Sequence, residues 1–115
     1  YNSGRDSTIE ELPRMHQEAD EVLAFLRNGL THLPHSPPDS FMAHANQWFD
    51  EICPLVKQAM TNRANRSFAI YLDFANCCAS VGYNIQHERY PRALAYMDQS
   101  RSHFALISID PEVSF

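Results

Sequence analysis

The sequence has no apolar run long enough to span a bilayer, and it has no basic stripe. A transmembrane helix needs about 20 consecutive apolar residues, so we expect no membrane-bound segment. Clusters of Lys and Arg neutralise nucleic-acid phosphates, and without one we expect no direct nucleic-acid binding. The polar start of the chain, residues 1–6, also lacks the charged and apolar regions of a signal peptide.

Cysteine is sparse and odd in number, with Cys53, Cys77 and Cys78. Neighbouring residues of a helix point about 100° apart, so Cys77 and Cys78 do not bridge readily. Three free thiols are typical of a reducing compartment, and we therefore expect a cytoplasmic protein. Cys77 and Cys78 lie in the most apolar part of the chain, where burial suppresses thiol reactivity. We interpret them as small core residues.

The net charge of −5 is unevenly distributed along the 115 residues. Residues 1–60 carry nine acidic and four basic side chains, whereas residues 61–115 carry five of each. The negative field therefore lies on the N-terminal half. With 44% apolar and 20% charged residues, the chain has the composition of one folded domain with a single modest core.

Apolar residues recur at helical spacing in four segments, and no segment shows convincing period-two alternation. We predict an all-α fold, a single small irregular bundle of about four helices spanning residues 7–110. A disordered leader is expected at residues 1–6 and a short tail at residues 111–115. Three prolines in residues 31–40 predict a long linker between the first and second helices.

Local signals predict the ends of the first two helices. An S/T-x-x-E capping box starts the first helix within residues 7–12, and Asn28-Gly29 ends it. Asp39 or Ser40 is expected to cap the second helix. Pro54 lies inside that helix and predicts a kink or a break, because proline removes one backbone hydrogen bond.

The last two helices follow from similar signals. Residues 67–83 form the third helix, and Gly82 either ends it or sits at a close contact with another helix. Pro91 occupies a favoured first-turn position of the fourth helix. Asp110-Pro111 is expected to end that helix.

Residues 67–83 are also the longest nearly uncharged stretch of the chain. At 100° per residue, their apolar side chains cover most of the helix circumference rather than one stripe. A helix of this kind needs cover on more than one side, and surplus apolar surface marks sites of association. We predict a partner interface anchored by Phe68, Tyr71, Leu72 and Tyr96.

Asp73 is the only charge in that stretch, and two interpretations are open. It forms a structural ion pair with a nearby arginine, or it lies at the rim of an interface. We favour the ion pair. The candidate cations are Arg66, Arg89, Arg92 and Arg101.

Six histidines raise the question of a metal site, and His32, His35 and His44 form the densest group. Zinc needs ligands that converge on one tetrahedron, and the proline-rich linker fixes no such geometry. We therefore predict no metal, no cofactor, no catalytic residue and no enzyme. A small metal-dependent hydrolase that uses these three histidines is the enzymatic alternative.

Two segments carry a resemblance to a known family, namely Phe68-Ala-Ile-Tyr-Leu-Asp-Phe74 and Tyr90-Pro-Arg-Ala-Leu-Ala-Tyr96. Together with the length and the acidic first half, they resemble the QslA-like small helical antiactivators of LuxR-type quorum-sensing regulators. The resemblance implies a bacterial, homodimeric, non-catalytic inhibitor that binds such a regulator and blocks its dimerisation. DNA binding by the regulator would then fail, because two half-sites need a dimer.

An immunity protein that neutralises a toxin domain is the alternative within the binding class. Such a protein typically presents an acidic face to a basic active site, and the acidic N-terminal half would suit that role.

Overall fold

The computed structural model describes residues 11–109, and in this range the chain forms four long helices and no strand. They are α1 (Leu12–Gly29), α2 (Asp39–Asn62), α3 (Ser67–Gln86) and α4 (Tyr90–Ile109), with short 3₁₀ turns η2 (Leu30–His32) and η3 (Ala64–Arg66). The predicted all-α bundle is confirmed. The predicted leader, residues 1–6, and tail, residues 111–115, lie outside the described range. Within residues 11–109, no helix combines the length and apolar character that crossing a membrane requires.

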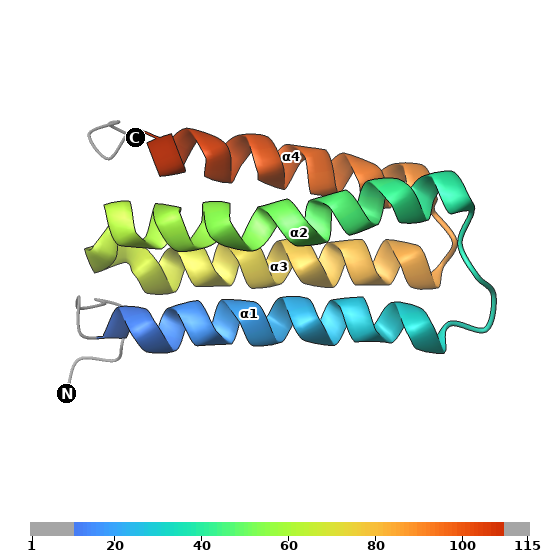
Figure 1. The fold of residues 1–115 in the computed structure, drawn as a ribbon, viewed down its shortest axis with the longest axis horizontal. Helices are drawn as coiled ribbons and strands as arrows, with labels where there is room; N and C mark the ends of the chain where they lie inside the picture. Colours follow the sequence, from blue (N-terminus) through green and yellow to red (C-terminus); the bar gives the residue numbers. More distant parts are fainter. Residues whose placement is uncertain (1–10, 110–115) are drawn as a thin grey trace.

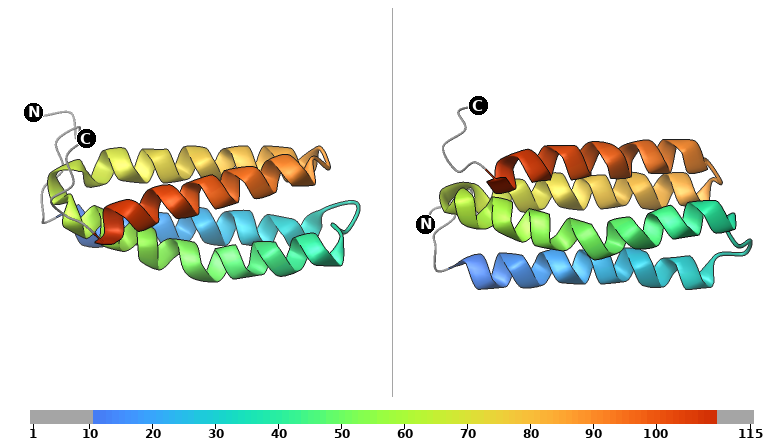
Figure 2. Two further views of the ribbon diagram at one scale, coloured as in Figure 1. Left: turned by 90° about the horizontal axis from the view of Figure 1, so that it is seen from above. Right: turned by 45° about the horizontal axis from the view of Figure 1, so that its top comes forward.

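The four helices lie side by side, and each runs opposite to its predecessor in the chain (Figure 1). As a result α1 and α3 run in one direction, and α2 and α4 run in the other (Figures 1 and 2). The most extensive contact joins α2 to α4, and α3 packs between α1 and α4. Helices α2 and α3 also touch across the bundle, which leaves α1 and α4 at opposite corners. Helix α3 therefore has two flanks, one toward α1 and one toward α4.

The core lies between the four helices and is built from aromatic and aliphatic side chains at helical spacing. Phe74 of α3 meets Phe104 of α4 edge to face, with ring centroids 6.2 Å apart. The largest fully buried apolar side chains come from all four helices: Met15, Trp48, Ile52, Val56, Met60, Phe74, Val81, Met97 and Phe104.

Helix α2 passes through Pro54 without a break, so the predicted alternative of two shorter helices is wrong. Pro54 is exposed, which leaves its ring and the carbonyl that loses its partner on the solvent side of the helix. The ribbon of α2 is curved rather than straight (Figure 2). Bending is the usual result of a proline inside a helix.

The start of α2 also differs from the prediction, because Pro38 is the N-cap residue and no side chain caps the helix. The Pro38 carbonyl accepts a hydrogen bond from the Met42 N–H at 3.0 Å. Asp39 therefore lies in the first turn, where its charge complements the helix dipole. In α1, Gly29 is the last residue, as predicted, and Pro13 lies in the first turn. The capping box at Ser7–Glu10 falls outside the described residues.

Helix α3 continues one turn past Gly82, so Gly82 does not end it. The end is formed instead by Glu88, which has a positive φ of 57°. The Glu88 N–H donates to the Ile85 carbonyl at 3.0 Å, and the Arg89 N–H donates to the Asn84 carbonyl at 2.7 Å. This pair of bonds is a Schellman motif, which ordinarily places glycine at the left-handed position.

Candidate functional site: an apolar groove between α1 and α3

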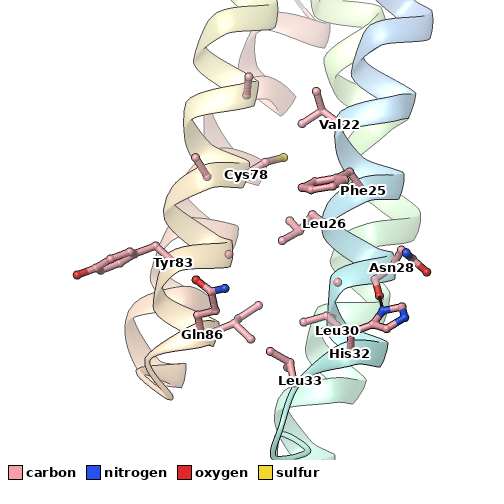
Figure 3. A pocket seen from close by; sticks show the side chains of 15 residues that line it. Val22, Phe25, Leu26, Asn28, Leu30, His32, Leu33, Cys78, Tyr83 and Gln86 are labelled. Carbon is pink, nitrogen blue, oxygen red and sulfur yellow. Dashed lines mark hydrogen bonds between the residues drawn. The ribbon is translucent and has the colours of Figure 1, made fainter.

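An open groove of about 610 Å³ runs between the C-terminal halves of α1 and α3 (Figure 3). Its α1 side is built by Val22, Phe25, Leu26, Asn28 and Gly29, followed by Leu30, His32 and Leu33 from the segment after α1. Its α3 side is built by Ala75, Cys78, Ala79, Gly82, Tyr83, Ile85 and Gln86. Most of these side chains are apolar, and none belongs to Asp, Glu, Lys or Arg. We call this feature the α1–α3 groove.

The groove exists because α3 presents small residues toward α1. Ala75 and Ala79 lie one turn apart, and Gly82 follows at nearly the same angle around the helix. At Gly82 the two helices approach closely, since a Cβ on that residue would lie only 3.2 Å from Leu26 Cδ1. The short side chains leave the space above this contact open, and Figure 3 shows Leu26 and Cys78 pointing into it.

Phe25 is the most exposed large apolar residue among residues 11–109, at 83%. It lies outside the buried stripe of α1, and Figure 3 shows its ring at the gap between the two helices. Tyr83 borders the groove from α3, is 53% exposed and points away from the gap (Figure 3). A single exposed apolar residue is ordinary, but one beside an apolar groove extends a contiguous surface.

Charged side chains on the α2-facing flank of α1 are engaged in ion pairs. Asp20 Oδ2 lies 2.7 Å from Lys57 Nζ, and Arg27 Nη1 lies 3.4 Å from Asp50 Oδ1. These pairs tie α1 to α2. Both are largely solvent-exposed, so each contributes little to the free energy of folding.

Carboxylates on the α3-facing flank of α1 lie near the N-terminal end of the groove. Partial burial raises the pKa of Tyr71 on α3, and the negative charges of Glu18 and Glu21 raise it further. Glu18 and Glu21 each lie one helical turn before a groove residue of α1, Val22 and Phe25, so they share the flank of α1 that borders α3. This end of the α1–α3 seam is acidic.

The three cysteines are free thiols, and Cys78 contributes to the floor of the groove. Burial raises the pKa of Cys77 and Cys78. Burial, followed by the charge of Asp20, raises the pKa of Cys53 to about 12. The raised pKa keeps the Cys78 thiol protonated at neutral pH, and the reactive, metal-binding form is the thiolate. Cys78 therefore presents an uncharged, apolar surface to the groove.

The four predicted anchors do not form one surface. Phe68 and Tyr71 are half-buried against the core, with ring centroids 6.4 Å apart, and Tyr71 lies toward α1. Tyr96 is 39% exposed and lines a shallow hollow between α3 and α4 together with Asp73. Leu72 is 42% exposed. The structure therefore places Tyr96 on the opposite flank of α3 from Tyr71.

Asp73 is exposed and forms no ion pair within residues 11–109. Arg101, one of its predicted partners, pairs instead with Glu51 of α2 at 3.3 Å. The favoured ion pair is therefore wrong. Asp73 is a solvated charge beside the hollow between α3 and α4.

The three histidines of the enzymatic alternative have separate environments. His44 Nε2 lies 3.0 Å from Asp98 Oδ1 on α4, and His32 Nδ1 lies 3.1 Å from the Asn28 carbonyl oxygen. His35 is exposed in the segment before α2. Within residues 11–109, no three His, Cys, Asp or Glu side chains are positioned to share a metal ion.

Sequence reasoning missed the part that Phe25 and Leu26 play in the groove, whereas the close helix contact predicted as one alternative for Gly82 is confirmed. Two signals pointed to the groove. Phe25 is a large aromatic residue outside the apolar stripe of its helix. Ala75 and Ala79, like Cys78 and Gly82, are small residues spaced four apart, a spacing that lets a neighbouring helix approach.

Comparison with known protein families, with curated proteins and with solved structures finds no match for this chain.

Proposed function

We propose that this protein is a non-catalytic binding module that takes an apolar helical segment of a partner protein into the α1–α3 groove. The observation that carries the proposal is the groove itself, about 610 Å³ of mostly apolar space beside the 83%-exposed Phe25. Large contiguous apolar surfaces on soluble domains mark association sites. Aromatic residues set in an uncharged surround are the usual anchors of such interfaces.

The shape of the groove favours a helix as its occupant. Helices α1 and α3 run in the same direction, and the furrow between two packed helices accepts the side-chain ridge of a third helix. Binding of an amphipathic helix in an apolar groove is a common mode of peptide recognition. Covering Phe25 would remove a nearly fully exposed aromatic ring from water, which contributes about 1.5–3 kcal/mol for a side chain of this size.

The partner class comes from the sequence resemblance. On that basis we propose an antiactivator that binds a LuxR-type quorum-sensing regulator and occupies the surface the regulator uses to dimerise. A helix taken from the dimer interface of the regulator is the kind of segment the groove would receive. Inhibition then needs no chemistry, only occlusion, because a monomeric regulator cannot hold two half-sites.

The experiment measures binding of a LuxR-type ligand-binding domain by calorimetry, with a matched pair of variants. Phe25→Asp puts a charge at the groove, whereas Ala24→Asp puts the same charge on an exposed position of α1 that does not line it. We expect Phe25→Asp to weaken binding at least tenfold and Ala24→Asp to leave it nearly unchanged. Equal loss in both variants, or no binding by the unmodified protein, contradicts the proposal.

The proposal includes a homodimer, as the resemblance implies. Besides Phe25 and Tyr83, which border the groove, the large exposed apolar residues of the described range lie on α3 and α4: Leu72, Tyr96, Leu106 and Ile109. A surface of this kind supports self-association away from the α1–α3 groove. Light scattering of the purified protein tests it, and a mass equal to one chain at all concentrations contradicts it.

The immunity-protein alternative would rest on the acidic N-terminal half. At the contact between α1 and α2, however, Asp20 of α1 and Asp50 of α2 are already paired with cations of this chain. That pairing leaves less negative charge for a basic active site, and the apolar groove therefore favours the binding module described above. Pull-down against toxin domains would separate the two functions.

A further inference from the structure

The two flanks of α1 differ in whether a cation of this chain pairs with their carboxylates. Toward α2, Asp20 has Lys57 at 2.7 Å. Toward α3, Glu18 and Glu21 have no cation within ion-pair distance among residues 11–109, and Glu21 accepts only a hydrogen bond from Gln17 at 3.2 Å. Glu18 and Glu21 are thus negative charges that the described part of the chain leaves without a cationic partner.

These two carboxylates stand in a fixed relation to the groove. Glu18 precedes Val22 by four residues, and Glu21 precedes Phe25 by four, so each lies one turn before a residue that lines the groove. With a rise of 1.5 Å per residue, about 6 Å along the axis of α1 separates each carboxylate-bearing residue from its groove residue. Leu26, near the middle of the groove, follows Glu21 by five residues and Glu18 by eight, which is about 7.5 Å and about 12 Å along the axis. The apolar groove therefore ends at an acidic border.

A helix bound along the groove would contact the apolar side chains of the groove and, further along, Glu18 and Glu21. Its apolar side chains enter between α1 and α3, and the next turn or two lies over Glu18 and Glu21. A neutral or acidic side chain there would leave these carboxylates unpaired or repelled, whereas Lys or Arg would pair with them. The distances from the two glutamates to the groove residues correspond to about four to eight residues of a helix, and this is the expected spacing between apolar anchor and cation in the occupant.

We infer that the segment taken into the α1–α3 groove is an amphipathic helix that carries Lys or Arg one to two turns from its apolar anchors, paired with Glu18 and Glu21. This inference rests on the proposed function and specifies the chemistry of the partner. The apolar part supplies most of the affinity, and the cations fix the position of the helix along the groove and reject acidic competitors.

The test uses two fluorescein-labelled, end-capped helical peptides with the same leucine face. One carries Lys about one and two turns from the leucines on both sides, and the other carries Glu at the same positions. Binding is measured by fluorescence anisotropy at low salt and at about 0.15 M salt, where exposed charges are screened beyond about 8 Å. We expect the Lys peptide to bind about fivefold more tightly at low salt and the difference to shrink at the higher salt.

Matched variants assign that preference to residues. The pair Glu18→Gln with Glu21→Gln should remove the preference for Lys and leave binding of the leucine face intact. The control removes the same number of charges elsewhere, by Asp73→Asn with Glu88→Gln, both exposed and neither lining the groove. The control should keep the full preference.

The outcomes separate the inference from the function on which it rests. Equal affinity for both peptides, with binding still lost in Phe25→Asp, overturns the charge preference and leaves the groove function standing. Retention of the preference in the Glu18→Gln and Glu21→Gln variant also overturns the inference. If neither peptide binds at about 1 mM, where a binding free energy of about −4 kcal/mol would be detected, both the inference and the groove function fail.

Discussion

Gly82 of α3 lies directly against Leu26 of α1, so close that a Cβ at Gly82 would be 3.2 Å from Leu26 Cδ1. Such a distance is tighter than ordinary van der Waals contact, and one of the two groups must move when a methyl group is added. Leu26 is only partly buried and borders the groove, so its flexible end has space to shift. A substitution at Gly82 that displaces Leu26 therefore also changes the space in the groove.

Gly82→Ala is expected to stabilise the fold and weaken binding together. Alanine in a helix interior is favoured over glycine by about 0.8–1 kcal/mol, and moving the Leu26 methyl costs part of that gain. The displaced methyl enters the groove and reduces the space for an occupant. Urea denaturation should show a gain of up to about 1 kcal/mol, while peptide affinity falls severalfold.

Gly29→Ala is the matched control, because a Cβ at Gly29 meets nothing within 4 Å. It should leave Leu26 in place, and it serves as the control for stability only, because Gly29 itself lines the groove. A loss of more than about 1 kcal/mol of stability in Gly82→Ala would show that Leu26 cannot yield.

Ser100→Ala is expected to destabilise the contact between α2 and α4. The buried Trp48 Nε1–H donates to Ser100 Oγ at 3.1 Å, and that hydroxyl donates to the Met97 carbonyl at 2.8 Å. Removing the hydroxyl leaves the indole N–H buried without an acceptor, which costs about 1–3 kcal/mol. Thermal unfolding should shift downward by about 4–8 °C per kcal/mol lost.

Ser102→Ala on the exposed face of the same helix controls for helix propensity. It should be neutral or slightly stabilising, since alanine is the better helix former. If both serine variants behave alike, the Trp48 hydrogen bond contributes nothing to stability.

Glu88→Gly is expected to stabilise the turn between α3 and α4. Glu88 has φ of 57°, a left-handed conformation that costs a residue with a Cβ about 1–2 kcal/mol. Glycine adopts it without that cost but loses more entropy on folding, so a net gain of about 0.5–1 kcal/mol is expected. Chemical denaturation measures it, with Glu88→Ala as the control that keeps the strain. Equal stability of the two variants would contradict the explanation.

Much of the fold follows from local signals in the sequence. The helical spacing of apolar residues, Pro91 in a first turn, and Gly29 at a helix end predicted four helices and their approximate bounds. The predictions failed at two helix ends, the start of α2 and the end of α3, where the backbone or an unusual residue takes the place of the expected capping residue. At the start of α2, the backbone of Pro38 supplies the cap in place of a side chain, and at the end of α3 a glutamate occupies the position typical of glycine.

The groove could not be predicted in the same way, because it depends on which flank of each helix faces which neighbour. Tyr71 and Tyr96 are both aromatic and near the apolar stretch, yet one faces α1 and the other borders α4. That difference is set by how four helices pack, and helical spacing within one segment carries no information about it. Likewise, His44 meets Asp98 across 54 positions of sequence, a pairing that only the tertiary fold creates.

The free thiols make the stability of the fold fall in alkaline solution. Burial raises the pKa of Cys53 from 9.0 to about 12 and raises that of Cys78 as well. In the unfolded chain these thiols ionise near 9, so between about pH 9 and pH 12 the unfolded state binds fewer protons than the folded state. The free energy of unfolding is therefore fully retained below about pH 9 and decreases as pH rises above it.

Urea denaturation at about pH 7 and about pH 10.5 should show this decrease, with the midpoint lower at the higher pH. Replacing both Cys53 and Cys78 by Ala should flatten the dependence, and replacing only the half-buried Cys77 should do so less. Labelling with a thiol reagent near pH 8 offers an independent check, because the thiolate is the reactive form. Cys53 and Cys78 should react slowly in the folded protein and rapidly in urea, and rapid labelling of all three thiols without urea would contradict their burial.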